Sequence, residues 1–214
     1  MKDMTDKLIM NYGKEKTEKM LSYLDLILER NNYINLTAIK GRDEAVIKHL
    51  ADSLSVTVLP EYKEAEIIID IGTGAGFPGV MLAISDPDKN FVLLDSTLKR
   101  LKVIDEFTAE LGISNITTVH ARAEEISKKT EYHEAFDLCV TRAVASMDKL
   151  AGWCLPFVKN GKYFIAYKGE NYNEELQNSS KALKKYNGIT DRIVCYPEEP
   201  AELSGHVLVV IKKK

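Results

Sequence analysis

Apolar residues recur at three- and four-residue steps in the first sixty residues, which is the pattern of amphipathic helices. One helix is predicted over residues 5–30, with an apolar stripe formed by Leu8, Tyr12, Met20, Leu21, Leu24 and Leu28. After an irregular stretch, a second helix is predicted from Asp43, a favourable N-cap, to about Val58. Pro60 is expected to stop this helix.

From Glu66 onward, short apolar runs alternate with amphipathic stretches. The runs predict strands at residues 67–71, 91–95, 116–120, 136–141 and 163–167, with helices between them. Two more strands, at 189–196 and 206–213, are joined by a loop too short for a crossover helix, so they are expected to pair antiparallel.

This order predicts an α/β fold, in which a mostly parallel seven-stranded sheet carries helices on both faces. No linker and no internal repeat divides the chain. We therefore expect a single domain, residues 1–214, in which residues 1–60 form a helical cap on a core formed by residues 66–214.

Composition narrows the class of protein. The chain has 214 residues, of which 45% are hydrophobic and 29% charged, as in globular proteins. No run approaches the roughly 18 apolar residues of a membrane span, and the N-terminus lacks a signal-peptide core, so a cytoplasmic protein is expected. The net charge of −3 argues against coating of nucleic acid through bulk charge, but it leaves room for a local basic face.

The three cysteines, Cys139, Cys154 and Cys195, are widely spaced and form no C-x-x-C pair. We expect all three to be buried thiols rather than parts of a zinc site or a disulfide. With four histidines in the chain and no third ligand near His49 and Asp52, no metal site is predicted.

A dense glycine turn follows the first predicted strand, and its four glycines exceed what a plain tight turn needs. Gly74-x-Gly76-x-x-Gly79 matches the dinucleotide-binding fingerprint. Asp70-x-Gly72-x-Gly74-x-Gly76 matches the first motif of methyltransferases that use S-adenosylmethionine. The turn alone does not choose between them. The long segment before it and the terminal antiparallel hairpin favour the second.

Asp95 ends the second strand, about twenty residues after the turn. An acidic side chain at that place accepts hydrogen bonds from ribose hydroxyls, and both cofactors contain a ribose. The alternative is that Asp95 complements a helix dipole, which Ser96 beside it could do instead.

Two further turns are expected at the same edge of the sheet. In the turn from Ala121 to Glu125, a carboxylate could meet an adenine amino group, or the acids could simply favour a first helical turn. At the end of the fourth strand, Arg142 needs an anion or a carboxylate partner, and an internal salt bridge is the alternative. The loop after it holds neither a Pro-Pro-aromatic motif nor a Pro-Cys pair.

Basic residues are expected to surround the mouth of this crevice, as an RNA substrate would require. They are Lys99, Arg100, Lys102, Arg122, Arg142, Lys149 and Lys168. In the helical cap, the candidate crevice residues are Asn35-Leu-Thr37 and His49-Leu-Ala-Asp52-Ser53.

These segments, taken in order over nearly the whole chain, resemble the bacterial 16S ribosomal RNA guanine-N7 methyltransferase family (RsmG, also called glucose-inhibited division protein B). The shared segments are Asn35-Leu-Thr, His49-Leu-x-Asp-Ser, Asp70-Ile-Gly-Thr-Gly-Ala-Gly-Phe-Pro-Gly, Leu94-Asp-Ser, Lys99-Arg, Arg122-Ala-Glu-Glu, Thr141-Arg-Ala-Val-Ala and Tyr167-Lys-Gly. The resemblance implies a class I S-adenosylmethionine-dependent methyltransferase fold of the Rossmann-like type.

Together with the residues themselves, the resemblance implies two sets of site residues. Those expected to bind S-adenosylmethionine are Asp70, Gly72, Gly74, Phe77, Asp95, Ser96, Ala123, Glu124 and Arg142. Those expected to bind RNA are Lys99, Arg100, Arg122 and Lys168. No catalytic residue is predicted, because guanine N7 carries a free lone pair and no proton, so attack on the methyl group needs no general base.

The implied function is methyl transfer to N7 of a guanine in 16S ribosomal RNA, within the small subunit or an assembly intermediate, by a monomer that contacts no membrane. The alternatives are a methyltransferase acting on a small molecule or a protein, and a nucleotide-binding module without enzymatic activity.

Overall fold

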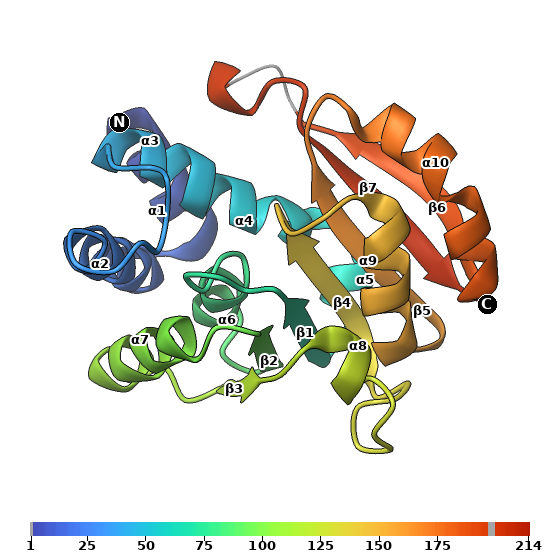
Figure 1. The fold of residues 1–214 in the computed structure, drawn as a ribbon. Coiled ribbons are helices and arrows are strands. Elements are labelled where there is room, and N and C mark those ends of the chain that lie inside the picture. Colours follow the sequence, from blue (N-terminus) through green and yellow to red (C-terminus); the bar gives the residue numbers. More distant parts are fainter. Residues whose placement is uncertain (1, 197–199) are drawn as a thin grey trace.

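The computed structural model describes residues 2–196 and 200–214, and Figure 1 shows how their helices surround a central sheet. The strands are β1 Ile67–Ile71, β2 Asn90–Asp95, β3 Ile116–His120, β4 Phe136–Arg142, β5 Val158–Lys168, β6 Gly188–Cys195 and β7 Val207–Lys213. The helices are α1 Lys2–Tyr12, α2 Lys14–Arg30, α3 Arg42–Ala45, α4 Asp52–Leu54, α5 Pro60–Lys63, α6 Gly79–Ser85, α7 Leu98–Glu110, α8 Ala123–Ile126, α9 Met147–Cys154 and α10 Tyr172–Lys185.

The described strands form one seven-stranded sheet in the order β3-β2-β1-β4-β5-β7-β6. The pairs β3–β2, β2–β1, β1–β4 and β4–β5 are parallel, while β7 pairs antiparallel with both β5 and β6. The predicted parallel sheet with an antiparallel terminal hairpin is confirmed. Strand order reverses between β1 and β4, so the carboxyl ends of these strands open a crevice where α/β proteins bind ligands.

The sheet is covered on both faces because its central strands are apolar on both sides. In β1, the side chains of Ile68, Ile69 and Ile71 are all buried. Ile68 belongs to a cluster with α2, α6 and α7, whereas Ile69 and Ile71 pack with α9 and its neighbours. Two hydrophobic layers therefore hold the crevice-forming strand ends at fixed positions.

The prediction of one continuous helix over residues 5–30 was wrong. Gly13 adopts φ +84° and separates α1 from α2. A left-handed backbone conformation is open to glycine at little steric cost, so the chain turns here although the apolar stripe continues. A residue without a side chain carries no signal in a hydrophobic pattern, which is why the break was missed.

The second predicted helix is helical over its expected length but irregular. It begins at Arg42 after Gly41, so Asp43 lies in the first turn and is not the N-cap. Val46–Ala51 is π-helical, and Ser55–Val58 is a 3-10 turn. Pro60 does follow the end of this run, but it also begins α5, as proline commonly does at a first helical position.

Cys139 and Cys154 are buried as predicted, but Cys195 is exposed, so that prediction was wrong. Cys195 ends β6, the edge strand of the sheet, where one side has no neighbouring strand. None of the described helices is long and apolar enough to cross a membrane.

The N-terminal helices are tied to the crevice by Tyr23 of α2. This side chain is fully buried, and its hydroxyl donates a 2.9 Å hydrogen bond to the carbonyl oxygen of Ala75 in the glycine turn. Its ring meets Phe77 edge to face at 5.9 Å. The cap thus fixes the backbone of the turn as well as burying apolar surface.

We expect Tyr23→Phe to lower the free energy of unfolding by about 1–3 kcal/mol, because the ring packing survives while the buried Ala75 carbonyl loses its donor. Chemical denaturation measures the change. Tyr33→Phe, at a side chain that is 85% exposed, is the matched control and should change little. Equal stabilities of Tyr23→Phe and the wild type would contradict this role.

Candidate functional site

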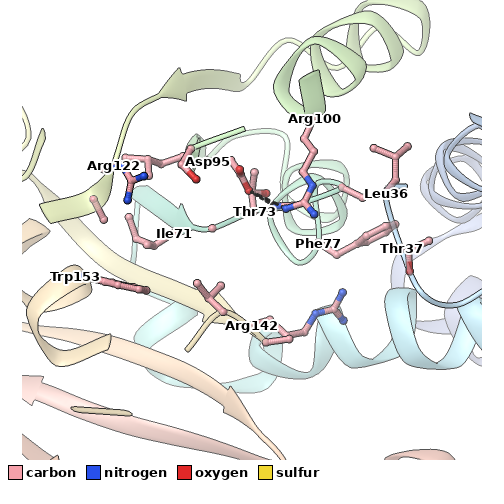
Figure 2. A pocket seen from close by; sticks show the side chains of 18 of the residues that line it. Leu36, Thr37, Ile71, Thr73, Phe77, Asp95, Arg100, Arg122, Arg142 and Trp153 are labelled. Carbon is pink, nitrogen blue, oxygen red and sulfur yellow. Dashed lines mark hydrogen bonds and ion pairs between the residues drawn. The ribbon is translucent and has the colours of Figure 1, made fainter. Parts of the chain in front are cut away.

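A hollow of about 560 Å³ lies where the carboxyl ends of β1, β2 and β4 meet, and we call it the first hollow. Figure 2 shows side chains from these strand ends and from the cap arranged around it. Its lining includes Leu36, Thr37, His49, Gly72, Thr73, Gly74, Phe77, Asp95, Ser96, Arg100, Arg122, Ala123, Glu124, Arg142, Val144 and Trp153. The volume is within the range of small-molecule sites.

The glycine turn lines the first hollow, and its glycines let neighbouring elements come close to its backbone. Gly72 adopts φ +72°, and a Cβ there would lie 2.6 Å from Val144 Cγ2. A Cβ at Gly76 would lie 2.5 Å from the Tyr23 hydroxyl oxygen. These glycines let the turn approach the loop after β4 on one side and the cap on the other.

Asp70 lies beneath the turn and does not line the first hollow. Its Oδ2 accepts a 2.9 Å hydrogen bond from the N–H of Gly79, at the start of α6. Burial raises the pKa of Asp70 to about 6, and nearby donors and Arg142 only partly offset this effect. In this position Asp70 holds the turn against helix α6, and a direct contact with a cofactor stays a prediction.

Asp95 links the turn to the next loop. Its Oδ2 accepts a 2.9 Å hydrogen bond from the Gly74 N–H, and its Oδ1 accepts a 2.7 Å bond from the Thr97 N–H. Each carboxylate oxygen keeps acceptor capacity toward the first hollow. The Nη1 of Arg100 also lies 3.9 Å from Asp95 Oδ2. The N-cap of helix α7 is Thr97 and not Ser96.

Arg142 has the internal carboxylate partner that the sequence left as one alternative. Its Nη1 lies 2.7 Å from Asp52 Oδ2, and both side chains are largely buried. The same atom donates to the carbonyl oxygen of Lys48 at 2.9 Å. The ion pair does not remove Arg142 from the site, because its side chain still lines the first hollow.

His49 continues this network as a neutral imidazole. Burial lowers its pKa to about 3, and the charge of Arg142 adds to the effect. Since the guanidinium only donates, the Nδ1 of His49, 3.1 Å from Arg142 Nη2, must be the acceptor. The proton therefore sits on Nε2 and is donated to Thr37 Oγ1 at 2.8 Å.

The same imidazole stacks on Phe77, with the ring centroids 4.5 Å apart and the planes 6° from parallel. Phe77 follows the glycine turn, and His49 belongs to the helical cap, so the stack joins the two. The guanidinium carbon of Arg142 also lies over the Phe77 ring, 5.7 Å from its centroid. A single network thus fixes Phe77 and Arg142 at the edge of the first hollow.

A second hollow of about 670 Å³ lies beside the first and shares His49, Arg142, Ala143 and Val144 with it. Its remaining lining includes Lys48, Asp52, Ala145, Tyr167, Lys168, Glu175, Glu202 and His206. The Nζ of Lys168 is held by Glu175 at 2.6 Å and by the Ala145 carbonyl oxygen at 2.7 Å.

The structure brings most of the predicted site residues together. Those lining the first hollow are Gly72, Gly74, Phe77, Asp95, Ser96, Arg100, Arg122, Ala123, Glu124 and Arg142. Lys168 lines the second hollow, whereas Asp70 and the exposed Lys99 line neither. Contacts of these residues with a cofactor or with RNA stay predictions.

One lining residue, Trp153 of α9, was not foreseen, and it faces the first hollow from the far end. It belongs to none of the recognised segments, although it is the single tryptophan of the chain and could have been noted for that reason. Ala143 belongs to the segment Thr141-Arg-Ala-Val-Ala, and its φ of +55°, which is uncommon for a residue with a side chain, could not be foreseen.

Comparison with known proteins gives a consistent result. The GidB family model, described as rRNA small subunit methyltransferase G, matches residues 16–204. A protein named ribosomal RNA small subunit methyltransferase G from Thermoanaerobacter sp. (strain X514) is 46% identical over 92% of this chain and 81% of its own length. A protein of the same name from Clostridium novyi (strain NT) is 41% identical over 95% of this chain and 84% of its own length.

Solved structures share the fold at low sequence identity. A precorrin-6y C5,15-methyltransferase from Geobacter metallireducens superposes with a TM-score of 0.53 at 15% identity, covering 85% of this chain and 92% of its own. A SAM-dependent O-methyltransferase from Thermotoga maritima gives 0.54 at 16% identity, covering 88% and 71%. With the sheet order, these matches confirm the expected class I methyltransferase fold.

We expect the wild type to lose about 1 kcal/mol more stability than His49→Gln between pH 6 and pH 5. The pKa of His49 lies below its ordinary value of 6.5 in the folded protein, so the unfolded chain alone gains a proton in this window. Groups that titrate in both proteins cancel. Denaturation at each pH measures the difference. In ¹H–¹⁵N NMR spectra at pH 5 the imidazole should remain the neutral Nε2–H tautomer, and a doubly protonated ring would contradict the assignment.

Proposed function

This chain belongs to the GidB family of rRNA small subunit methyltransferases G, and from that membership we propose that it transfers a methyl group from S-adenosylmethionine to N7 of a guanine in 16S ribosomal RNA. The observation that carries the proposal is the family match together with the first hollow at the strand-order switch. Neither a small-molecule or protein methyltransferase nor a nucleotide-binding module is favoured.

The residues around the first hollow fit S-adenosylmethionine. Asp95 offers acceptor oxygens for ribose hydroxyls at the end of β2, as in other nucleoside sites. Gly72 and Gly74 line the first hollow, and the open space beside Gly74 leaves room for the methionine part. Ala123 and Glu124 follow β3 on the same side, where a backbone group and a carboxylate can meet the adenine.

When bound, the cofactor supplies a methyl group already activated by the sulfonium centre. Guanine N7 has an in-plane lone pair and no proton, so none of the chain's residues has to act as a base before attack. Their task is to position the base and exclude water. Arg142 and Phe77 suit this task because the network through His49 and Asp52 fixes both side chains.

The partner of the chain follows from the same proposal. The substrate is 16S ribosomal RNA in the small subunit or in an assembly intermediate, and the enzyme acts as a monomeric single domain in the cytoplasm. Arg100 and Arg122 line the first hollow and Lys99 lies exposed on α7, so these cations can reach RNA phosphates. Lys168 is held by Glu175 and the Ala145 carbonyl oxygen, which leaves one donor of its ammonium group for RNA.

We expect Gly72→Val to weaken S-adenosylmethionine binding about ten- to hundredfold, measured by calorimetry. The new side chain would meet Val144 within 2.6 Å at a backbone φ of +72°, so the lining of the first hollow must shift. Gly112→Ala is the control, because φ there is +64° but nothing lies within 4 Å of the added carbon. Unchanged affinity in a folded Gly72→Val protein would remove the cofactor assignment.

The acceptor is tested by incubating the protein with radiolabelled S-adenosylmethionine and, separately, naked 16S ribosomal RNA, intact small subunits, and protein or small-molecule acceptors. We expect label in RNA, as 7-methylguanosine after nuclease digestion. The RNA and subunit arms show which form of the substrate is used. Label found only in protein or small molecules would overturn the proposed function.

A further inference from the structure

The second hollow is built around Asp52, a carboxylate with an incomplete set of partners. The residue is 4% exposed, and Oδ2 is paired with Arg142. Oδ1 is buried and has no hydrogen-bond partner among the described residues. His206 Nδ1 approaches it only to 3.6 Å, and the side chain of His206 is 37% exposed at the rim.

This carboxylate is charged. Burial raises the pKa of Asp52, but His206, Arg142 and the hydroxyl of Tyr196 oppose this effect and hold the pKa below its ordinary value. An ionised oxygen that is buried with no donor at hydrogen-bond distance is costly, and native proteins rarely leave one so. Two other carboxylates line this hollow. Glu175 already has Lys168 and the N–H of Met147 as donors, and Glu202 is exposed, so water can satisfy it. Asp52 Oδ1 is therefore the buried acceptor that a ligand of the second hollow would satisfy.

The chemistry of the bases selects the ligand. A carboxylate accepts two parallel N–H bonds, and guanine presents N1–H and the exocyclic N2–H side by side on its Watson–Crick edge. On the corresponding edges of adenine, cytosine and uracil, each donor is flanked by a ring nitrogen or carbonyl oxygen that would repel the carboxylate. Enzymes that modify an extruded base read it through this edge.

Resting on the proposed function, we propose that the second hollow receives the target base and that Asp52 selects guanine by accepting hydrogen bonds from N1–H and N2–H. One bond goes to Oδ1 and the other to the second lone pair of Oδ2, whose first lone pair is taken by Arg142. A guanine held in this way turns its N7-bearing edge away from Asp52, so the atom to be methylated stays free of the contact that recognises the base. The two hollows adjoin at Arg142 and Val144. His206, at the rim, lies over Oδ1 until the base enters.

The test compares guanosine with inosine, which lacks only the 2-amino group. The methylated position is first mapped by borohydride–aniline cleavage of RNA treated with the wild-type enzyme, and RNA carrying inosine at that position is then assembled by ligation. In single-turnover assays, we expect the wild type to prefer guanosine about ten- to hundredfold, as expected for the loss of a charge-assisted hydrogen bond. Asp52→Asn should transfer more slowly and show nearly equal rates on the two RNAs.

Glu61→Gln is the matched control. Glu61 is a carboxylate of the same side-chain exposure as Asp52, 6%, and it is paired with Arg192 at 2.7 Å, but it lines neither hollow. This variant should keep the full preference for guanosine. Circular dichroism and a cooperative thermal transition report whether each variant is folded, because the loss of Asp52 can itself change affinity for S-adenosylmethionine through Arg142.

The outcomes separate the two proposals. If Asp52→Asn is slow but keeps the wild-type preference, Asp52 only positions Arg142 and the assignment is overturned. Equal wild-type rates on guanosine and inosine RNA overturn it as well, without recourse to any variant that might not fold. If the wild type methylates no RNA at all, the proposed function itself has failed.

Discussion

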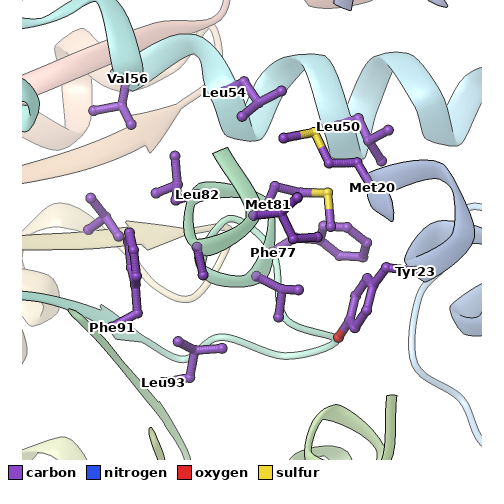
Figure 3. Close-up of a cluster of buried hydrophobic side chains, with 14 of the residues drawn as sticks. Met20, Tyr23, Leu50, Leu54, Val56, Phe77, Met81, Leu82, Phe91 and Leu93 are labelled. Atoms are coloured by element: carbon purple, nitrogen blue, oxygen red, sulfur yellow. The ribbon is translucent and has the colours of Figure 1, made fainter. Parts of the chain in front are cut away.

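The glycine turn between β1 and α6 is held by hydrogen bonds to its backbone from three directions. Tyr23 binds the Ala75 carbonyl from the cap, Asp95 binds the Gly74 N–H from β2, and Asp70 binds the Gly79 N–H from below. Its glycines have no side chains to pack, so these bonds, together with those from Gly72 and Thr73 to the Leu94 carbonyl oxygen, fix the backbone at those positions. Figure 3 shows Tyr23 beside Phe77 within the buried cluster that supports this side of the crevice.

The second constraint is the buried charge of Arg142, which lies between the two hollows. Arg142 brings a positive charge into a largely buried place, and the cost of that burial is offset by Asp52 and by neutral acceptors on His49 and Lys48. Burial lowers the pKa of His49, and the same charge adds to the effect, since a second cation beside Arg142 would be repelled. These hydrogen bonds hold the guanidinium of Arg142 in one orientation. Arg142 lines both hollows, so it is fixed at the place where a base and a methyl donor would have to meet.

The sequence was informative where local patterns determine structure. Strand β3 was predicted to the residue, and the apolar run of β1 with its glycines located the crevice, because alternation and turn chemistry act over a few residues. The break at Gly13 depends on a backbone conformation that a hydrophobic pattern does not record, and the π-helical stretch holds His49, which contacts Phe77 and Arg142 far along the chain. The same limit applies to the site. The Asp95 position was visible as a strand end, but the pairing of Arg142 with Asp52, ninety residues apart, was not.

The buried carboxylates of the site differ in the hydrogen-bond donors that surround them, and these donors determine what each carboxylate can do. Asp70 has one backbone donor and a raised pKa of about 6, and it holds the turn from beneath without lining the first hollow. Asp95 has a donor on each oxygen and still faces the first hollow. Asp52 alone combines a charged partner with an unsatisfied oxygen. Methylation of the guanine N7 lone pair needs no prior proton transfer. These carboxylates can therefore serve to orient the ligands and to discriminate between bases. The unpaired Oδ1 of Asp52 then serves to recognise the base. A buried carboxylate is stabilised most by the ligand whose N–H groups match its oxygens.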